Sequence, residues 1–355
     1  MANGPEFFST GPGVGVVVPM ALSEADVRHF EAFGAVVLRG VFTPREMERL
    51  TASAEEIWAA NRAEYAEVGE VAPDEHRHRW RIRNGSADQS CGGLLEHRPE
   101  LIALAADERI WGVARRLLGE GFVWVGSEGN VSSLETFNWH SDRKYYNHPN
   151  FAAAGDPSLL PPHFTQLKMM LYLEELGPET GCLNCIVGSH KSPLHEALGP
   201  QEHGRAENPT PFGAEAEELP RWPLPSRPGD VICFAHTLFH SVFNARGGKP
   251  PRRYLALKFA QRPRTAAQLF TLLRYTPTVI RPASTLAGSA SPRLRALVQP
   301  WLRLREAIGE EMAEELAGTT QAGWTQAEAG GWGLGEALEA AVGEGGAFAA
   351  PCAAL

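Results

Sequence analysis

The sequence predicts a mainly β protein, a sandwich or barrel flanked by helices. Its first support is a series of short apolar runs between residues 122 and 262, separated by turns rich in Gly, Pro and Asn. Strands at such regular spacing are typical of sandwiches and barrels. The second support is the placement of helical patterns before and after these runs. The clearest runs are "QLKMMLYLEEL", "GCLNCIVG", "GDVICFA" and "RRYLALKFA".

Helix signals come first along the chain. Acidic residues follow Ser23, and apolar Val27, Phe30 and Phe33 suit a short amphipathic helix. Thr43 caps a longer helix after a strand. The other expected elements are a helix over 101–118, strands over 122–142, a long loop over 194–228 and helix again after 265. The predicted domains are an N-terminal tail (1–20), a central domain (21–264) and a C-terminal helical extension with a Gly/Ala-rich tail (265–355).

Composition narrows the class of protein. The chain has 355 residues with 33 basic and 42 acidic side chains, a formal net charge of −9. This balance argues against nucleic acid or an anionic membrane as a partner. No apolar run approaches the ~18 residues that span a bilayer, and the first residues lack the pattern of a secretory signal. We therefore expect a cytoplasmic protein whose partner is a small-molecule substrate; the sequence leaves its oligomeric state open.

Cysteine usage agrees with a reducing compartment, because five cysteines in so long a chain are too few and too scattered for a disulfide framework. Cys182 and Cys185 form a CxxC pair, the spacing of zinc and redox sites. No second CxxC or nearby pair of histidines completes a zinc site, and "GCLNCIVGSH" is typical of a buried strand. The structural interpretation is favoured.

A candidate site lies in "ETFNWHSD". Side chains alternate between the two faces of a strand, so Asn138, His140 and Asp142 share a polar face while Phe137 and Trp139 pack on the other. Parity alone would also fit a hydrogen-bonded His–Asp pair on an exposed strand.

A third candidate ligand lies about a hundred residues on, in "GDVICFAHTLFHSVFNARGGKPPRRYLALKFA". This stretch holds a buried strand, two histidines, a Gly-rich hairpin and a strand that opens with two arginines. Two histidines and one carboxylate can hold Fe(II) by one face and leave the other positions open. Arginine on the following strand can grip a carboxylate bidentately.

With these segments in order, the chain resembles the phytanoyl-CoA dioxygenase family of Fe(II)/2-oxoglutarate oxygenases over residues 22–262. The resemblance rests on "LSEADVRHFEAFGAVVLRGVF", "WHSD", "ETGCLNCIVGSHK", "PGDVICFAHTLFHS" and the "PRR" strand. It implies a double-stranded β-helix, or jelly-roll (cupin-like), core. It also implies His140, Asp142 and His240 as iron ligands, Arg252 as the arginine that binds 2-oxoglutarate, and O2 as the second co-substrate.

Two alternatives concern the second histidine segment. His236 and His240 would share a face of a helix, as in a zinc protease, but no glutamate follows His236 and the preceding residues are strand-like. His236 could also replace His240 as the ligand, although the family pattern favours the histidine just before the hairpin. His190, in "GSHK", matches a family element that is usually structural.

The chain departs from the family at "HSV". Relatives often carry "HGS", whose serine helps to hold the co-substrate; here Val242 takes that position and Ser241 has the opposite parity. In "QLKMMLYL", Gln166, Lys168, Met170 and Tyr172 form the more polar face, which we assign to the barrel interior. Lys168 is therefore a candidate co-substrate contact, with a lysine that extends to the rim as the alternative.

If the resemblance holds, the protein hydroxylates a small-molecule metabolite in a bacterial tailoring or catabolic reaction, with release of succinate and CO2. The halogenating relatives lack the carboxylate that is present here as Asp142. Desaturation, epoxidation or rearrangement could use the same site, and a non-catalytic jelly-roll binding protein is the alternative from another class. The candidate substrate contacts are Asn138, Arg143, Tyr145 and Arg83, the last from an arginine-rich stretch that could equally form a solvated face.

Overall fold

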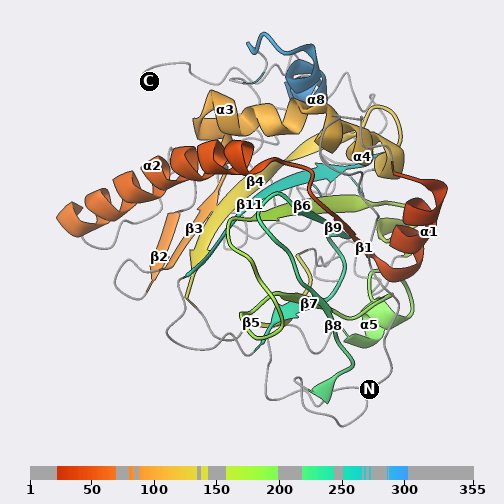
Figure 1. The fold of residues 1–355 in the computed structure, drawn as a ribbon. Helices are drawn as coiled ribbons and strands as arrows, with labels where there is room; N and C mark the ends of the chain where they lie inside the picture. Colours follow the sequence, from red (N-terminus) through yellow and green to blue (C-terminus); the bar gives the residue numbers. More distant parts are fainter. Residues whose placement is uncertain are drawn as a thin grey trace, which may run out of the picture.

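Two antiparallel sheets form the centre of the protein (Figure 1). The computed structural model describes residues 22–68, 80–83, 88–133, 137–142, 157–198, 218–243, 251–265, 268, 272, 286 and 288–302. The large sheet has the order β1 (Ala35–Leu38), β9 (Val231–Ala235), β6 (Gln166–Tyr172), β11 (Arg252–Ala260), β4 (Val123–Ser132), β3 (Asp88–Gly92) and β2 (Trp80–Arg83). The small sheet has the order β5 (Phe137–His140), β10 (His240–Val242), β7 (Leu183–Cys185) and β8 (Trp222–Leu224). This is a jelly-roll core, as expected from the sequence.

Helices cover the face of the large sheet that points away from the small sheet, where α2, α3, α4 and α8 lie together in Figure 1. The longer helices are α1 (Glu24–Phe33), α2 (Pro44–Val68), α4 (Glu108–Leu118) and α8 (Pro292–Leu302); α3 (Pro99–Ile102), α5 (Leu194–Leu198) and the 3-10 turns η1 (Leu95–His97), η2 (Ala103–Ala106) and η4 (Pro157–Leu159) are short. The buried Trp58 of α2 donates its indole N–H to the carbonyl of Gly129 in β4 at 3.4 Å. Leu297 and Val298 of α8 join the same core.

Both expected N-caps are present as capping boxes. The backbone N–H of Asp26 donates to Ser23 Oγ at 3.2 Å, and that of Ser23 donates to the Asp26 carboxylate at 2.9 Å. Thr43 and Glu46 repeat the arrangement at the start of α2. The two helices therefore begin directly after their polar N-cap residues, Ser23 and Thr43.

Two expectations need correction. The helix predicted over 101–118 is broken, because Asp107 accepts a hydrogen bond from the N–H of Arg109 and starts α4 as a new helix. The loop predicted over 194–228 contains α5 and β8, with 199–217 outside the described residues. In both places a local cap or a short tertiary pairing decides the structure, and neither produces a long periodic pattern in the sequence.

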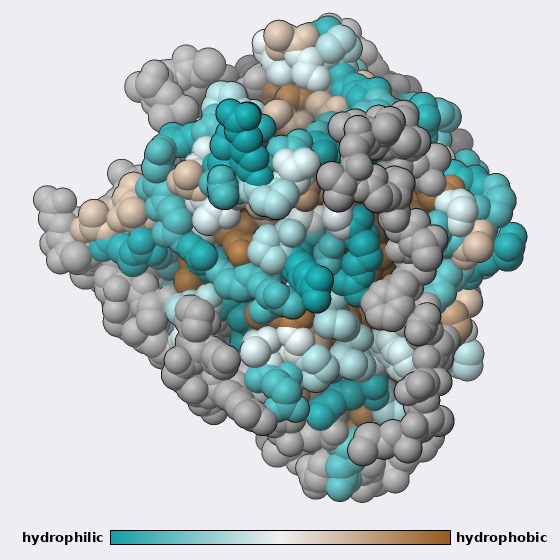
Figure 2. Space-filling model, viewed as in Figure 1, coloured by the Kyte–Doolittle hydropathy of each residue, from teal (hydrophilic) through white to brown (hydrophobic). Residues whose placement is uncertain are grey.

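The described surface in Figure 2 is mostly hydrophilic, with apolar residues in small separate areas. Among the described residues, Val187 is the one large apolar side chain classed as exposed, at 36%. Trp139 is fully buried and packs edge to face on Phe243, with ring centroids 5.4 Å apart, behind the small sheet. No helix in the described part of the chain is long and apolar enough to cross a membrane.

The CxxC pair is part of the core. Cys182 and Cys185 are both buried, and burial raises the pKa of each thiol to about 12. A thiol with such a pKa stays protonated at neutral pH, whereas metal ligands and redox nucleophiles are thiolates. The structural interpretation of the pair is supported.

His190 joins the end of α1 to the jelly roll. Its imidazole is fully buried, its Nε2 lies 3.2 Å from the carbonyl oxygen of Glu31, and its ring lies against Gly34. A Cβ at Gly34 would come within 2.5 Å of His190 Nδ1, and Gly34 has φ +87°. Burial is the main reason that the pKa of His190 falls to about 4. This histidine is therefore structural, in agreement with the sequence.

The tight contact between the turn before β9 and the chain before α2 can be tested by a substitution at Gly229. It has φ +97°, and a Cβ there would lie 2.3 Å from the carbonyl oxygen of Phe42. Gly229→Ala should cost about 3 kcal/mol or more of unfolding free energy, because backbone strain and a clash add together. Gly40→Ala is the control, since Gly40 also has positive φ but open space, and should cost about 1–2 kcal/mol. Equal losses in urea denaturation would contradict the close contact.

His190 predicts acid sensitivity of the fold. The pKa of His190 is about 4 in the folded protein, against an ordinary value of 6.5. Between pH 6.5 and pH 4 the imidazole is therefore protonated in the unfolded chain but not in the folded one, so the free energy of unfolding falls as the pH falls. From pH 7.5 to pH 5 the loss from this group should be about 2 kcal/mol. The contribution of His190 is isolated by measuring the free energy of unfolding of His190→Gln and of the natural chain at both pH values. A variant with the same pH dependence as the natural chain would exclude this role for His190.

Candidate metal centre

Strand pairing brings the two histidines of the candidate site together. β5 and β10 are antiparallel neighbours in the small sheet, and His140 and His240 stand directly opposite one another. Their ring centroids are 4.1 Å apart. Asp142 follows β5 by two residues, and its backbone N–H donates to the carbonyl of His236 at 3.0 Å, which fixes the carboxylate beside both rings. Residues about a hundred positions apart in the sequence thus lie next to one another in the structure.

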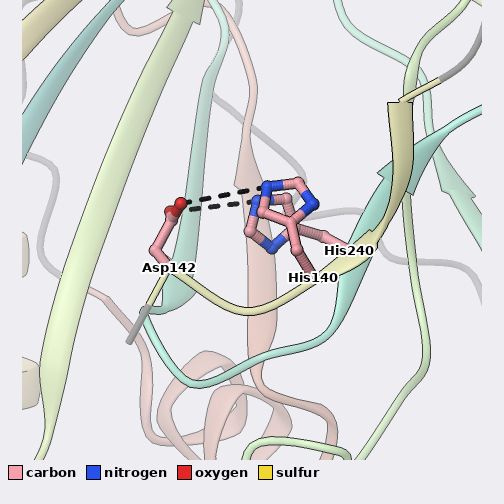
Figure 3. A group of neighbouring side chains, drawn as sticks. All are labelled: His140, Asp142 and His240. Carbon is pink, nitrogen blue, oxygen red and sulfur yellow. Dashed lines mark ion pairs between the residues drawn. The ribbon is translucent and has the colours of Figure 1, made fainter. Parts of the chain in front are cut away.

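The three side chains point toward one another (Figure 3). Among the described residues, His140, Asp142 and His240 are the one group of three in which every potential ligand atom lies within 4.8 Å of the others. His140 Nε2 is 3.9 Å from Asp142 Oδ1, and His240 Nε2 is 3.8 Å from Asp142 Oδ2. These separations are too long for direct hydrogen bonds. The three side chains face a common space.

The protonation states suit a metal ion. Burial alone would raise the pKa of Asp142, but Lys168 and the surrounding imidazoles hold it well below the usual range. Burial lowers the pKa of His240, so its imidazole is neutral at neutral pH. The carbonyl of Leu238 lies 2.9 Å from His240 Nδ1, which favours the tautomer with Nε2 free to coordinate. Two imidazoles and a carboxylate are a donor set that suits Fe(II).

His236 lies beside the group but outside it. Its Nε2 is 3.9 Å from Asp142 Oδ2, and it is not among the three residues whose donor atoms all lie close together. The strand pairing that sets His240 opposite His140 explains the difference, because His236 continues from β9 in the large sheet. The geometry therefore favours His240 over His236 as the third ligand.

The interior face of the large sheet carries charged side chains next to this group. Lys168 Nζ is 3.1 Å from Asp142 Oδ2 and also contacts Glu128 of β4. Lys258 Nζ lies 2.6 Å from the other oxygen of Glu128. Burial opposes the charge on Lys168, yet Asp142 and Glu128 keep its pKa well above the usual value. We term Asp142, Lys168, Glu128 and Lys258 the buried ion chain.

The sequence did not indicate Glu128, and the interior position expected for Lys258 carried no assigned role. Lys168 was expected to contact a co-substrate; the structure places its ammonium on Asp142 and Glu128. Glu128 and Lys258 could have been found as charged residues within largely apolar strands. Lys258 also has the same parity as Arg252 and lies opposite Lys168 in the register of β11 and β6.

The two arginines that open β11 lie on opposite faces. Arg253 points outward, where it pairs with Glu174 and with Glu55 of α2. Arg252 is 7% exposed, and burial lowers the pKa of its guanidinium. Tyr254, two residues on, packs edge to face on Tyr172 with ring centroids 5.7 Å apart. Arg252 and the two tyrosines form a polar lining on β6 and β11.

Gln166 is a further interior residue whose importance the sequence did not indicate. The residue is 2% exposed, and in the described part of the chain neither polar atom of its side chain has a hydrogen-bond partner. Lys168 lies two residues along the same strand, and the N–H of His236 donates to the carbonyl of Gln166 at 2.9 Å. A buried amide without partners costs about 1–3 kcal/mol, so it is a suitable contact for a ligand beside the three-residue group.

The candidate substrate contacts are less defined. Asn138 lies on β5 and Arg83 on β2, the edge strand of the large sheet, and only their backbone is described. Arg143 and Tyr145 lie outside the described residues. Their proposed roles remain predictions from the sequence.

Comparisons with known proteins identify a family. A protein-family model described as phytanoyl-CoA dioxygenase (PhyH) matches residues 30–254, a range that includes His140, Asp142, His240 and Arg252. No curated protein matches the chain.

Several solved structures are similar at low identity. EctD from S. alaskensis with bound Fe is 24% identical, with a TM-score of 0.48, over 70% of this chain and 79% of that chain. HygX from Streptomyces hygroscopicus with nickel and 2-oxoglutarate bound is 17% identical, with a TM-score of 0.47, over 68% and 88%. The non-heme alpha ketoglutarate dependent carbocyclase SnoK from nogalamycin biosynthesis is 19% identical, with a TM-score of 0.47, over 70% and 88%.

Proposed function

The chain belongs to the phytanoyl-CoA dioxygenase family, and we propose that it is an Fe(II)- and 2-oxoglutarate-dependent oxygenase that hydroxylates a small metabolite. The observation that carries the proposal is the convergence of His140, Asp142 and His240, with donor atoms within 4.8 Å of one another. Their donor set fits Fe(II). When bound, Fe(II) and 2-oxoglutarate use O2 to insert one oxygen atom into a substrate C–H bond and place the other in succinate, with loss of CO2.

The protein's own residues bind and orient the reactants. Arg252 offers a buried guanidinium to the distal carboxylate of 2-oxoglutarate, an interaction that is bidentate and charge-assisted. The chain lacks the serine that relatives often carry, with Val242 at that position. Tyr172 and Tyr254, which line the same interior face as Arg252, are the groups we propose to replace it.

The substrate would lie against the three-residue group at the start of β6. Gln166 supplies a buried donor and acceptor there, so it suits a polar group of the substrate next to the reacting C–H bond. His240 is buried beside this position. Asn138, Arg83, Arg143 and Tyr145 are the further proposed substrate contacts.

The first test removes the carboxylate ligand. Asp142→Ala should abolish the formation of succinate from 2-oxoglutarate and O2 in the presence of Fe(II), because one of three ligands is lost. The fold should persist, because Lys168 keeps its partner Glu128 when the carboxylate of Asp142 is removed. Succinate is measured by chromatography and folding by circular dichroism. Succinate formation by a folded Asp142→Ala variant at the natural rate would refute the assignment.

The second test distinguishes the adjacent arginines. Arg252→Ala should weaken 2-oxoglutarate binding by roughly 30- to 150-fold, about 2–3 kcal/mol, because a charge-assisted bidentate contact is lost. Arg253→Ala is the matched control, since its guanidinium pairs with Glu55 and Glu174 on the outside. Calorimetric titration of 2-oxoglutarate compares the two. A large loss for Arg253→Ala alone would mean that the other arginine binds the co-substrate.

A further inference from the structure

The buried ion chain links a candidate metal ligand to three charged side chains on three strands. Asp142 Oδ2 lies 3.1 Å from Lys168 of β6, Lys168 contacts Glu128 of β4, and Glu128 lies 2.6 Å from Lys258 of β11. The side chain of Lys168 is 5% exposed and that of Glu128 is 16% exposed. The two positive and two negative charges cancel.

Stability of the fold does not account for this arrangement. Lys168 and Lys258 stand directly opposite each other on neighbouring strands, and like charges in that position would destabilise the sheet without Glu128, which pairs with both. Apolar side chains of similar size would usually be as stable as buried ion pairs, or more stable. The position of Lys168 on Asp142 points to a role in what the site binds.

We infer that Lys168 is a positioning residue that holds Asp142 Oδ2 and sets the charge of the pocket, so that it weakens metal binding and strengthens binding of the 2-oxoglutarate dianion. This inference rests on the proposed function. A fixed positive charge beside the ligand carboxylate repels a divalent cation and attracts a dianion, and the effect is strong where water is excluded. Its hydrogen bond to Oδ2 leaves the other oxygen of Asp142 for coordination.

The two binding constants should therefore change in opposite directions when this charge is removed. Lys168→Gln deletes the charge but keeps an N–H donor near Asp142. It should bind Co(II) about tenfold or more tightly and, with Co(II) saturating, bind 2-oxoglutarate about tenfold or more weakly. Lys168→Arg keeps both charge and donor and should leave both constants near those of the natural protein.

Two more variants complete the design. Lys258→Gln is the matched control, because it removes the same charge from Glu128 without touching Asp142, and both constants should change less than in Lys168→Gln. Glu128→Gln makes the pocket more positive and should give the mirror image, with weaker Co(II) binding and tighter 2-oxoglutarate binding. It also keeps the inference testable if Lys168→Gln does not fold.

The measurements are anaerobic. Co(II) affinity is obtained by competition with a chelating dye, 2-oxoglutarate affinity by calorimetry, and folding by circular dichroism. Opposite changes in Lys168→Gln, mirrored in Glu128→Gln, would support the inference. Weakening of both ligands in Lys168→Gln, or no change in either, would overturn it and leave a purely structural lysine. A natural protein that binds neither Co(II) nor 2-oxoglutarate would instead refute the proposed function.

Discussion

The pairing of β5 with β10 positions the candidate metal centre. This pairing places His140 opposite His240, and the hydrogen bond from the N–H of Asp142 to the carbonyl of His236 then brings the carboxylate beside them. Neither strand is long, so the small sheet needs the large sheet and its helices to hold it in place. A fixed backbone of this kind supports a metal centre better than loops alone, because ligands must be held to within about 0.5 Å.

Charge is the second organising feature of the site. Asp142 is surrounded by His140, His236, His240 and Lys168, which keeps it ionised in a pocket that would otherwise favour the neutral acid. Glu128 and Lys258 extend the alternation of charges away from the site. The interior of this jelly roll thus has a polar lining beside the apolar core between the large sheet and the helices. That division separates the candidate metal centre from the apolar core that stabilises the fold.

Much of this was predictable from the sequence, because alternation along a strand is a local property. Parity alone set His140 and Asp142 on one face and Trp139 on the other. The third ligand required the resemblance to a family, because nothing local specifies which distant strand pairs with β5. Glu128 was missed for the same reason, since its partners lie 40 and 130 residues away. The break before α4 was missed because one side-chain cap at Asp107 outweighs the helical pattern around it.

The central claim is that His140, Asp142 and His240 hold Fe(II) in a form that binds 2-oxoglutarate. The most direct measurement is the visible absorption spectrum of the natural protein under anaerobic conditions with Fe(II) and 2-oxoglutarate. A weak metal-to-ligand charge-transfer band that needs both components, and is absent with either alone, is the predicted result. A folded protein that gives no such band with both components would contradict the claim and favour a non-catalytic binding protein with this fold.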